Sequence, residues 1–310
     1  MSLLSVIIPS YNEKESVEHI ITALKNVLDE EKIDFEIIFI DDGSTDSTFE
    51  IIKEQAKQKK NISGYRLSRN YGKESAIWAG LQKIRGDCCV VIDCDLQHPP
   101  ETIPKMFRLW EEGYEIVEGV KSNRGKESVF SKLFTKLFYK IISSMSGLDM
   151  KTSSDFKLLD KQVVDELMLF NERNTFFRGL SFWVGFRSTK VEYDVAPRKY
   201  GKTKWSTNSL TKYAIDCIIN FSAKPLQLVT GLGFILIIAS LVMVIQTIVR
   251  YSLGYSLEGF TTIILLLLLI GGGLMISLGI IGLYIAKIYD EVKRRPRFII
   301  SESIENSDIS

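Results

Sequence analysis

Two aspartates separated by a single residue are the clearest candidates for chemistry in this chain. Asp93 and Asp95 follow the continuous apolar run Cys88–Ile92, and Gln97 adds a neutral oxygen two residues later. Carboxylate and amide oxygens suit Mg²⁺ or Mn²⁺, ions that commonly bind a diphosphate as well. We therefore predict a divalent-cation site here, which would neutralise the charge of a leaving diphosphate.

The elements that must position these side chains alternate between strand and helix. Strands are predicted at 5–9, 35–40, 65–67, 88–93 and 115–120, and helices at about 13–28, 46–60, 73–84 and 101–111. This alternation is typical of an α/β fold with a doubly wound, mostly parallel sheet. Ligands of such sheets bind beyond the carboxyl ends of the strands. The expected site is therefore built from residues 9–13, 41–43, 68–72 and 93–95.

Charge and motifs argue against two other classes of protein. The net charge is +1, from 39 basic and 38 acidic residues, whereas a nucleic-acid-binding domain usually carries a strong basic excess. No G-x-G-x-x-G follows the first predicted strand, as a dinucleotide-dependent redox enzyme would require, and no phosphate-binding loop G-x-x-x-x-G-K-[ST] occurs. We expect no nucleic-acid partner.

The C-terminal part of the chain is strongly apolar. Between Pro225 and Ala286 the only charged residues are Arg250 and Glu258. The segments 225–250 and 260–286 are each long enough to cross a bilayer. Lysines and arginines gather before the first and after the second, so the positive-inside rule places both termini in the cytoplasm. A pair of buried core helices is the alternative interpretation.

Small residues mark one face of the second apolar segment. Gly273 and Ser277 form a small-x-x-x-small pair, as do Gly282 and Ala286. Such pairs let helices approach closely in a membrane. We therefore expect a homo-oligomer that associates through these helices.

Four motifs occur in order along the N-terminal part. They are V-I-I-P-S-Y-N-E from Val6, D-D-G-S-T-D-S-T from Asp41, D-C-D-L-Q-H-P-P-E from Asp93 and S-D-F-K-L-L-D-K from Ser154. Their combination resembles family 2 glycosyltransferases, specifically the polyprenyl-phosphate glycosyltransferases that include dolichyl-phosphate mannose synthase. With its two apolar segments the chain is similar to the bactoprenol (undecaprenyl-phosphate) glucosyltransferase branch. The resemblance covers about residues 4 to 298 and implies a nucleotide-sugar-binding GT-A type fold.

The resemblance implies roles for residues of the donor site. The residues matching those that hold the nucleoside and diphosphate are Pro9, Tyr11, Glu13, Asp42, Asp93 and Asp95. Asp95 and Gln97, with Asp93, match the ligands of Mg²⁺ or Mn²⁺. Arg198 and Lys204 match a loop that closes over the diphosphate.

Asp155 matches the family aspartate usually assigned as the catalytic base. A phosphate monoester has a second pKa near 6 and is largely dianionic at neutral pH, so strict base catalysis is optional. The alternative role for Asp155 is to position the acceptor or the sugar.

An amphipathic pattern over 128–146 and a second over 206–224 suit helices at the membrane interface. A helix packed on the sheet would explain the first pattern equally well. The basic candidates to receive a lipid phosphate are Lys121, Arg124, Lys132 and Arg178. The expected organisation is a cytoplasmic catalytic domain over 1–205, the apolar segments, and a basic cytoplasmic tail over 287–310.

The resemblance implies an inverting transfer of a hexose, with UDP-glucose as the donor and undecaprenyl phosphate as the acceptor, at the inner membrane leaflet. The same framework serves donors of GlcNAc, galactose or mannose, the last from GDP-mannose. A processive polysaccharide synthase is a second alternative, but no Q-x-x-R-W motif is present. A catalytically silent membrane scaffold for a lipid flippase is an alternative of another class.

Overall fold

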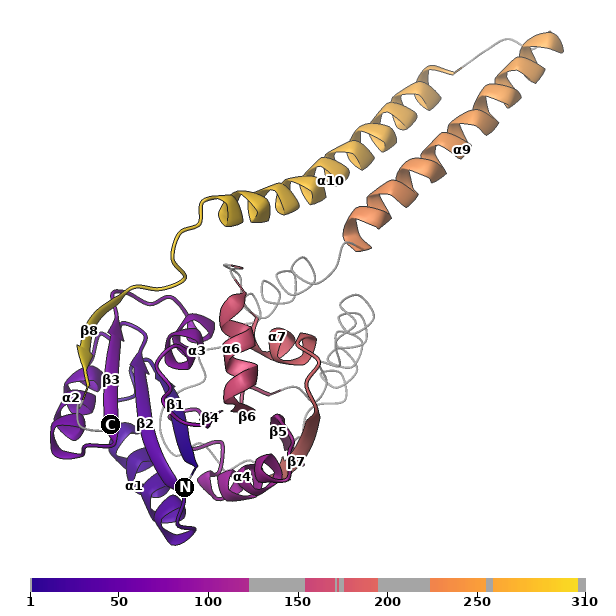
Figure 1. Cartoon of the computed structure of the whole chain (residues 1–310). Coiled ribbons are helices and arrows are strands. Elements are labelled where there is room, and N and C mark those ends of the chain that lie inside the picture. Colours follow the sequence, from indigo (N-terminus) through magenta and orange to yellow (C-terminus); the bar gives the residue numbers. More distant parts are fainter. Residues whose placement is uncertain are drawn as a thin grey trace. The chain divides into compact units, whose positions relative to one another are not determined.

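The computed structural model describes residues 2–122, 154–170, 172, 176–194, 224–254 and 259–305 (Figure 1). These residues belong to two compact units. An α/β unit is built from residues before 207 together with those after 295, and a helical unit covers the apolar part of the chain up to Arg295. The predicted amphipathic segment 128–146 lies outside the described residues, as do all of 206–224 but Lys224 and the four basic residues Arg124, Lys132, Arg198 and Lys204.

Four parallel strands form the centre of the α/β unit. They are β1 (Leu3–Ser10), β2 (Asp34–Asp41), β3 (Ile62–Leu67) and β4 (Cys88–Val91). β1 pairs with β2 on one side and with β4 on the other, and β2 pairs with β3. Parallel pairing brings the carboxyl ends of all four strands to one edge of the sheet.

Four further strands extend this centre into an eight-stranded sheet with the order β7-β5-β6-β4-β1-β2-β3-β8. They are β5 (Ile116–Lys121), β6 (Lys157–Asp160), β7 (Ser188–Tyr193) and β8 (Ile300–Ile304). β6 is antiparallel to both β4 and β5, while β7 is parallel to β5. The predicted α/β class with a mostly parallel sheet is confirmed.

Helices cover both faces of the sheet. They are α1 (Val17–Glu30), α2 (Thr48–Gln58), α3 (Lys73–Leu81), the 3₁₀ turn η1 (Pro100–Thr102), α4 (Ile103–Glu111), α6 (Lys161–Leu169) and α7 (Phe177–Trp183). Successive residues of β2 point to opposite faces. Ile37 and Phe39 join the core beneath α1, whereas Ile38 and Ile40 join a second cluster beneath α3.

α3 lies close to the centre of the sheet because of a glycine. A Cβ atom added at Gly80 would stand 2.3 Å from the side chain of Ile7 on β1. A larger residue at this position would push α3 away from the sheet, and α3 begins at the candidate site described below.

The last strand of the sheet comes from the predicted basic tail. β8 pairs antiparallel with β3, and the Ser68 amide donates to the Ile299 carbonyl at 2.8 Å. Lys53 contacts Glu302 at 3.0 Å across this edge. The segment after the apolar helices is therefore part of the α/β unit, a feature that the prediction of a tail over 287–310 does not anticipate.

The helical unit contains α9 (Lys224–Ser252) and α10 (Phe260–Val292). Both are long and apolar enough to cross a membrane, with candidate spans Pro225–Ser252 and Leu269–Val292. The most apolar stretch of each helix has no buried residues in the structure. The alternative interpretation, a pair of core helices, would require these stretches to be buried. A Cβ atom added at Gly273 would lie 3.6 Å from Leu236, so this small residue faces α9 of the same chain.

Candidate active site

The loop after β2 binds the loop after β3 through a buried carboxylate. Asp42 accepts hydrogen bonds from the backbone amides of Tyr71 at 2.7 Å and Gly72 at 2.8 Å. Gly72 has a φ of +96°, a conformation that favours glycine. Burial raises the pKa of Asp42 to about 6, although the two amides oppose that rise. Asp42 thus fixes the turn from which α3 begins.

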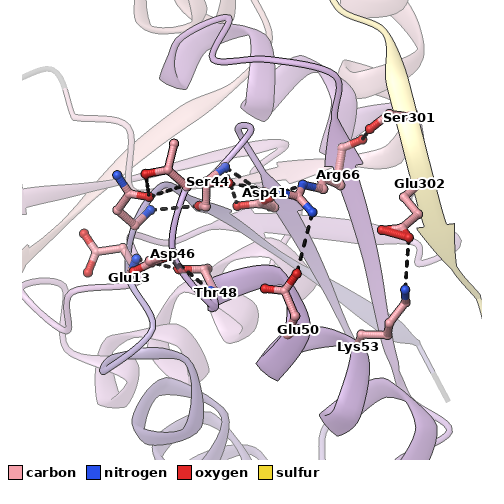
Figure 2. Close-up of polar contacts among 12 residues, drawn as sticks. Glu13, Asp41, Ser44, Asp46, Thr48, Glu50, Lys53, Arg66, Ser301 and Glu302 are labelled. Atoms are coloured by element: carbon pink, nitrogen blue, oxygen red, sulfur yellow. Dashed lines mark hydrogen bonds and ion pairs between the residues drawn. The ribbon is translucent and has the colours of Figure 1, made fainter.

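A second set of polar contacts holds the loop after β2 in place (Figure 2). Asp41 is fully buried and accepts from the Ser44 amide at 3.2 Å. The Arg66 side chain of β3 contacts the Asp41 carboxylate at 3.4 Å and donates to the Ser44 carbonyl at 3.0 Å. Both carboxylates of the D-D-G motif therefore serve to order this edge of the sheet.

The loop after β1 is bound to the same framework. The Asn12 amide donates to the Ser44 hydroxyl at 2.8 Å, and the Glu13 amide donates to the Thr48 hydroxyl at 2.9 Å. Asn12 has a φ of +52°, in the left-handed region. Of the predicted nucleoside-binding residues, Pro9 is buried at the end of β1, while Tyr11 and Glu13 are half-buried in this loop. They lie beside Asp42 at the carboxyl edge of the sheet.

Asp93 and Asp95 follow β4 at this edge. The Gln97 amide donates to Asp95 at 3.1 Å, and Leu96 between them has a φ of +58°. Asp95 is buried, with 8% of its surface exposed, whereas the Asp93 side chain is 28% exposed. The described part of the chain contains no group of three or more acidic, histidine or cysteine side chains placed to hold a metal ion. Carboxylates at a strand end nevertheless fit Mg²⁺ or Mn²⁺, which complete their coordination with phosphate oxygens and water.

A lysine that sequence reasoning missed joins the two predicted catalytic regions. The Nζ of Lys73, the first residue of α3, lies 2.6 Å from Asp93 and 2.8 Å from Asp155. One cation therefore links the metal motif to the candidate base. Partial burial of Asp93 disfavours its ionisation, but the ammonium of Lys73 holds the pKa of Asp93 below its usual value.

Asp155 has both carboxylate oxygens in ion pairs. Arg178 of α7 donates from Nε to one oxygen at 2.6 Å and from a terminal nitrogen to the other at 2.8 Å. Burial alone would raise the pKa of Asp155, but Lys73 and Arg178 hold it well below its usual range. Asp155 is thus a poor proton acceptor at neutral pH, and Arg178, predicted to bind the acceptor phosphate, lies against it.

A buried lysine and a half-buried glutamate hold the segment that carries Asp155. The Lys157 ammonium contacts Glu118 at 3.2 Å and donates to the Ser181 hydroxyl at 2.8 Å. Glu118 also accepts from the Ser154 amide at 2.9 Å. Burial lowers the pKa of Lys157, which Glu118 partly offsets. These contacts bind the 154–157 segment to both β5 and α7.

Glu74 connects α3 to α7 on the other side of the cluster. Its carboxylate accepts from the Phe177 amide at 2.8 Å. Burial raises the pKa of Glu74 to about 7, and the charge of Asp155 adds to the rise. A Lys-Glu pair at the start of a helix is typical of a solvated helix terminus, so no distinctive sequence pattern marks either residue.

Lys121, the remaining described candidate for the acceptor phosphate, is exposed at the end of β5. β5 is antiparallel to β6, which is antiparallel to β4, so β5 runs parallel to β4. Lys121 therefore lies at the same edge of the sheet as Asp93, but no described contact joins it to the cluster around Lys73.

Comparisons with known proteins agree on one family. The model for glycosyl transferase family 2 matches residues 5–168. The uncharacterized glycosyltransferase sll0501 of Synechocystis sp. is 38% identical over 304 residues, covering 96% of this chain and 95% of that protein. The SfII prophage-derived bactoprenol glucosyl transferase of Shigella flexneri is 33% identical over 305 residues, covering 97% of this chain and 98% of that protein.

A solved structure is similar to part of the chain. Glucosyl-3-phosphoglycerate synthase from Mycobacterium tuberculosis, in complex with Mn²⁺, UDP and glucosyl-3-phosphoglycerate, has a TM-score of 0.48 and 20% sequence identity. The match covers 70% of this chain and 78% of that one.

Proposed function

The chain belongs to glycosyl transferase family 2, and on that premise we propose that it transfers glucose from UDP-glucose to undecaprenyl phosphate. The observation that carries the proposal is the cluster in which Lys73 joins Asp93 to Asp155 at the carboxyl edge of the sheet. Support for the sugar and the lipid comes from full-length relatives named bactoprenol glucosyl transferase. Support for a lipid acceptor also comes from α9 and α10.

The donor binds across the loops after β1, β2 and β4. Pro9, Tyr11, Glu13 and Asp42 contact the nucleoside, because their loops are bound together at the strand ends where ligands of such sheets lie. Asp95, with Gln97 and Asp93, would hold Mg²⁺ or Mn²⁺. When bound, that ion supplies positive charge that neutralises the diphosphate. Arg198 and Lys204 contribute further positive charge to the same group.

The reaction is a single displacement with inversion. An oxygen of the lipid phosphate forms a bond to the anomeric carbon while the bond from that carbon to the diphosphate oxygen breaks, and UDP leaves with the electron pair. The acceptor is largely dianionic at neutral pH and needs no base. Asp155 therefore serves to position Lys73 and Arg178, consistent with the low pKa of its carboxyl group.

The acceptor phosphate reaches the site at the membrane surface. Arg178 lies in the cluster, and Lys121, Arg124 and Lys132 are the other cations that we assign to it. The spans α9 and α10 hold the catalytic domain at the cytoplasmic face, in line with the basic residues that flank them. Gly282 and Ala286 are the small pair that we assign to self-association, since Gly273 faces α9.

The test is to supply purified protein in vesicles with undecaprenyl phosphate and, separately, UDP-glucose, UDP-GlcNAc, UDP-galactose or GDP-mannose. We expect mass spectrometry to detect a glucosylated lipid phosphate and NMR to show that its anomeric configuration is inverted relative to the donor. A product from another donor would correct the sugar. No product from any donor, with intact binding of UDP, would favour the silent scaffold. An Asp95→Ala protein is the matched control.

A further inference from the structure

The α/β unit carries an apolar patch on its surface. Three large apolar side chains at the ends of α6 and α7 are exposed: Leu169 by 67%, Phe182 by 60% and Trp183 by 65%. Among the described residues of this unit, Ile299, at 51%, is the only other large apolar residue that is exposed. Exposed apolar side chains that form a contiguous surface mark interaction sites.

The two helices present these side chains as one surface. α6 and α7 lie side by side (Figure 1). The ring of Phe170, directly after α6, packs edge-on against Trp183 with 5.3 Å between ring centroids. We call Leu169, Phe170, Phe182 and Trp183 the α6–α7 patch.

The chain itself links this patch to the end of the apolar helix α10. Arg297 donates a hydrogen bond to the carbonyl of Phe170, and its guanidinium lies 4.5 Å from the ring centroid of Trp78. Arg297 is only five positions along the chain from Val292, where both α10 and its candidate span end. Five extended residues reach at most about 18 Å. The short linker and the hydrogen bond of Arg297 together tether Phe170 to the end of α10.

The residues between them indicate the depth of that point. Lys293, Arg294 and Arg295 follow α10 directly, and clusters of basic residues beside a span bind anionic headgroups. Tryptophan is favoured at the same level, where its apolar ring and its polar N–H are both accommodated, and phenylalanine and leucine are apolar residues that interfacial helices insert beside it. A partner for the patch must therefore be apolar, bordered by negative charge and close to the end of α10. The lipid surface meets all three conditions.

We propose that the α6–α7 patch inserts into the interfacial layer of the bilayer that α10 crosses and docks the α/β unit on it. This inference rests on the proposed membrane function and deepens it. α7 carries Arg178 and Ser181, whose contacts reach Asp155 and Lys157. A docked α7 therefore sets the height of the catalytic cluster above the lipid phosphates, and Phe182 and Trp183 are positioning residues for the acceptor.

Fluorescence quenching tests the contact without requiring catalysis. The chain has Trp78, Trp110, Trp183 and Trp205. A Trp205→Phe protein is placed in nanodiscs whose acyl chains are either brominated near the headgroup or unmodified. We expect quenching that is largely lost on adding Trp183→Phe and retained on adding Trp110→Phe. Equal quenching with and without Trp183 would overturn the proposal. That result is expected if a second copy of the chain or residues 128–146 cover the patch instead of lipid.

Kinetics separate docking from a structural role. We expect the Phe182→Ser/Trp183→Ser protein to show about a tenfold higher KM for undecaprenyl phosphate in vesicles, a factor that corresponds to 1.4 kcal/mol. The kcat and the KM for a short, water-soluble prenyl phosphate should stay within about twofold. Parallel losses with both acceptors would refute docking. Quenching without any sugar transfer would refute only the proposed function.

Discussion

Replacing Lys73 by methionine would leave two carboxylates facing each other. The ammonium lies 2.6 Å from Asp93 and 2.8 Å from Asp155, so those two carboxylate oxygens are at most about 5.4 Å apart. At an effective dielectric constant of about 20 their repulsion is about 3 kcal/mol. Because 39% of the Lys73 side chain is exposed, solvent screening reduces this to roughly 1.5–3 kcal/mol. Arg178 still neutralises one side of Asp155, which favours the lower half of that range.

We therefore expect Lys73→Met to lower kcat/KM for the nucleotide sugar roughly 10- to 100-fold, and Lys73→Arg to recover most of the loss. The assay is initial-rate transfer to undecaprenyl phosphate in vesicles with varied donor concentration. Lys53→Met is the matched control, because its ion pair with Glu302 is exposed and worth at most about 1 kcal/mol. A Lys73→Met protein within about threefold of wild type would refute the reasoning.

Three further predictions concern the carboxylates of the site. Asp155→Asn should lower kcat about 10- to 100-fold without changing the shape of the pH–rate profile, because the pKa of Asp155 is too low for a base; near wild-type turnover would remove it from the site. Asp95→Ala should abolish the activity that EDTA removes and Mg²⁺ or Mn²⁺ restores, and unchanged EDTA-sensitive turnover would exclude it as a ligand. The pKa of Asp42 is raised to about 6, so lowering the pH through 6 to 5 protonates its carboxylate. The affinity for UDP-glucose, measured by calorimetry, should fall over this pH range in the wild type. In Asp42→Asn the affinity should not change over the same range.

The centre of the fold could be predicted from the sequence because its signals are local. Cys88–Val91 is a continuous apolar run, as buried parallel strands require, and the polar residues that follow such strands must meet at one edge. β8 gave no such signal. Its sequence Ile300-Ser-Glu-Ser-Ile304 is mostly exposed, and its partner β3 lies more than 230 residues earlier.

The site was predictable in its acidic residues but not in their partners. Asp93 and Asp155 stand in recognisable motifs, whereas Lys73 begins a helix with residues typical of any solvated terminus. α3 connects β3 to β4 along the chain, and only the folding of these strands into one sheet brings the Lys73 ammonium between the two carboxylates. The proton affinity of Asp155 depends on the same long-range contacts, and no local pattern reveals it.

The position of β8 at the end of the chain affects the order of events during synthesis. β3 is complete at Leu67, but the strand that pairs with it begins at Ile300, after both apolar helices have been made. At about 5–20 residues per second the outer edge of β3 would wait roughly 10–50 s for its partner. An unpaired edge strand is a template for aggregation. On the proposed membrane function, α9 and α10 insert during this interval, so the sheet would be completed only on a nascent chain that is already anchored.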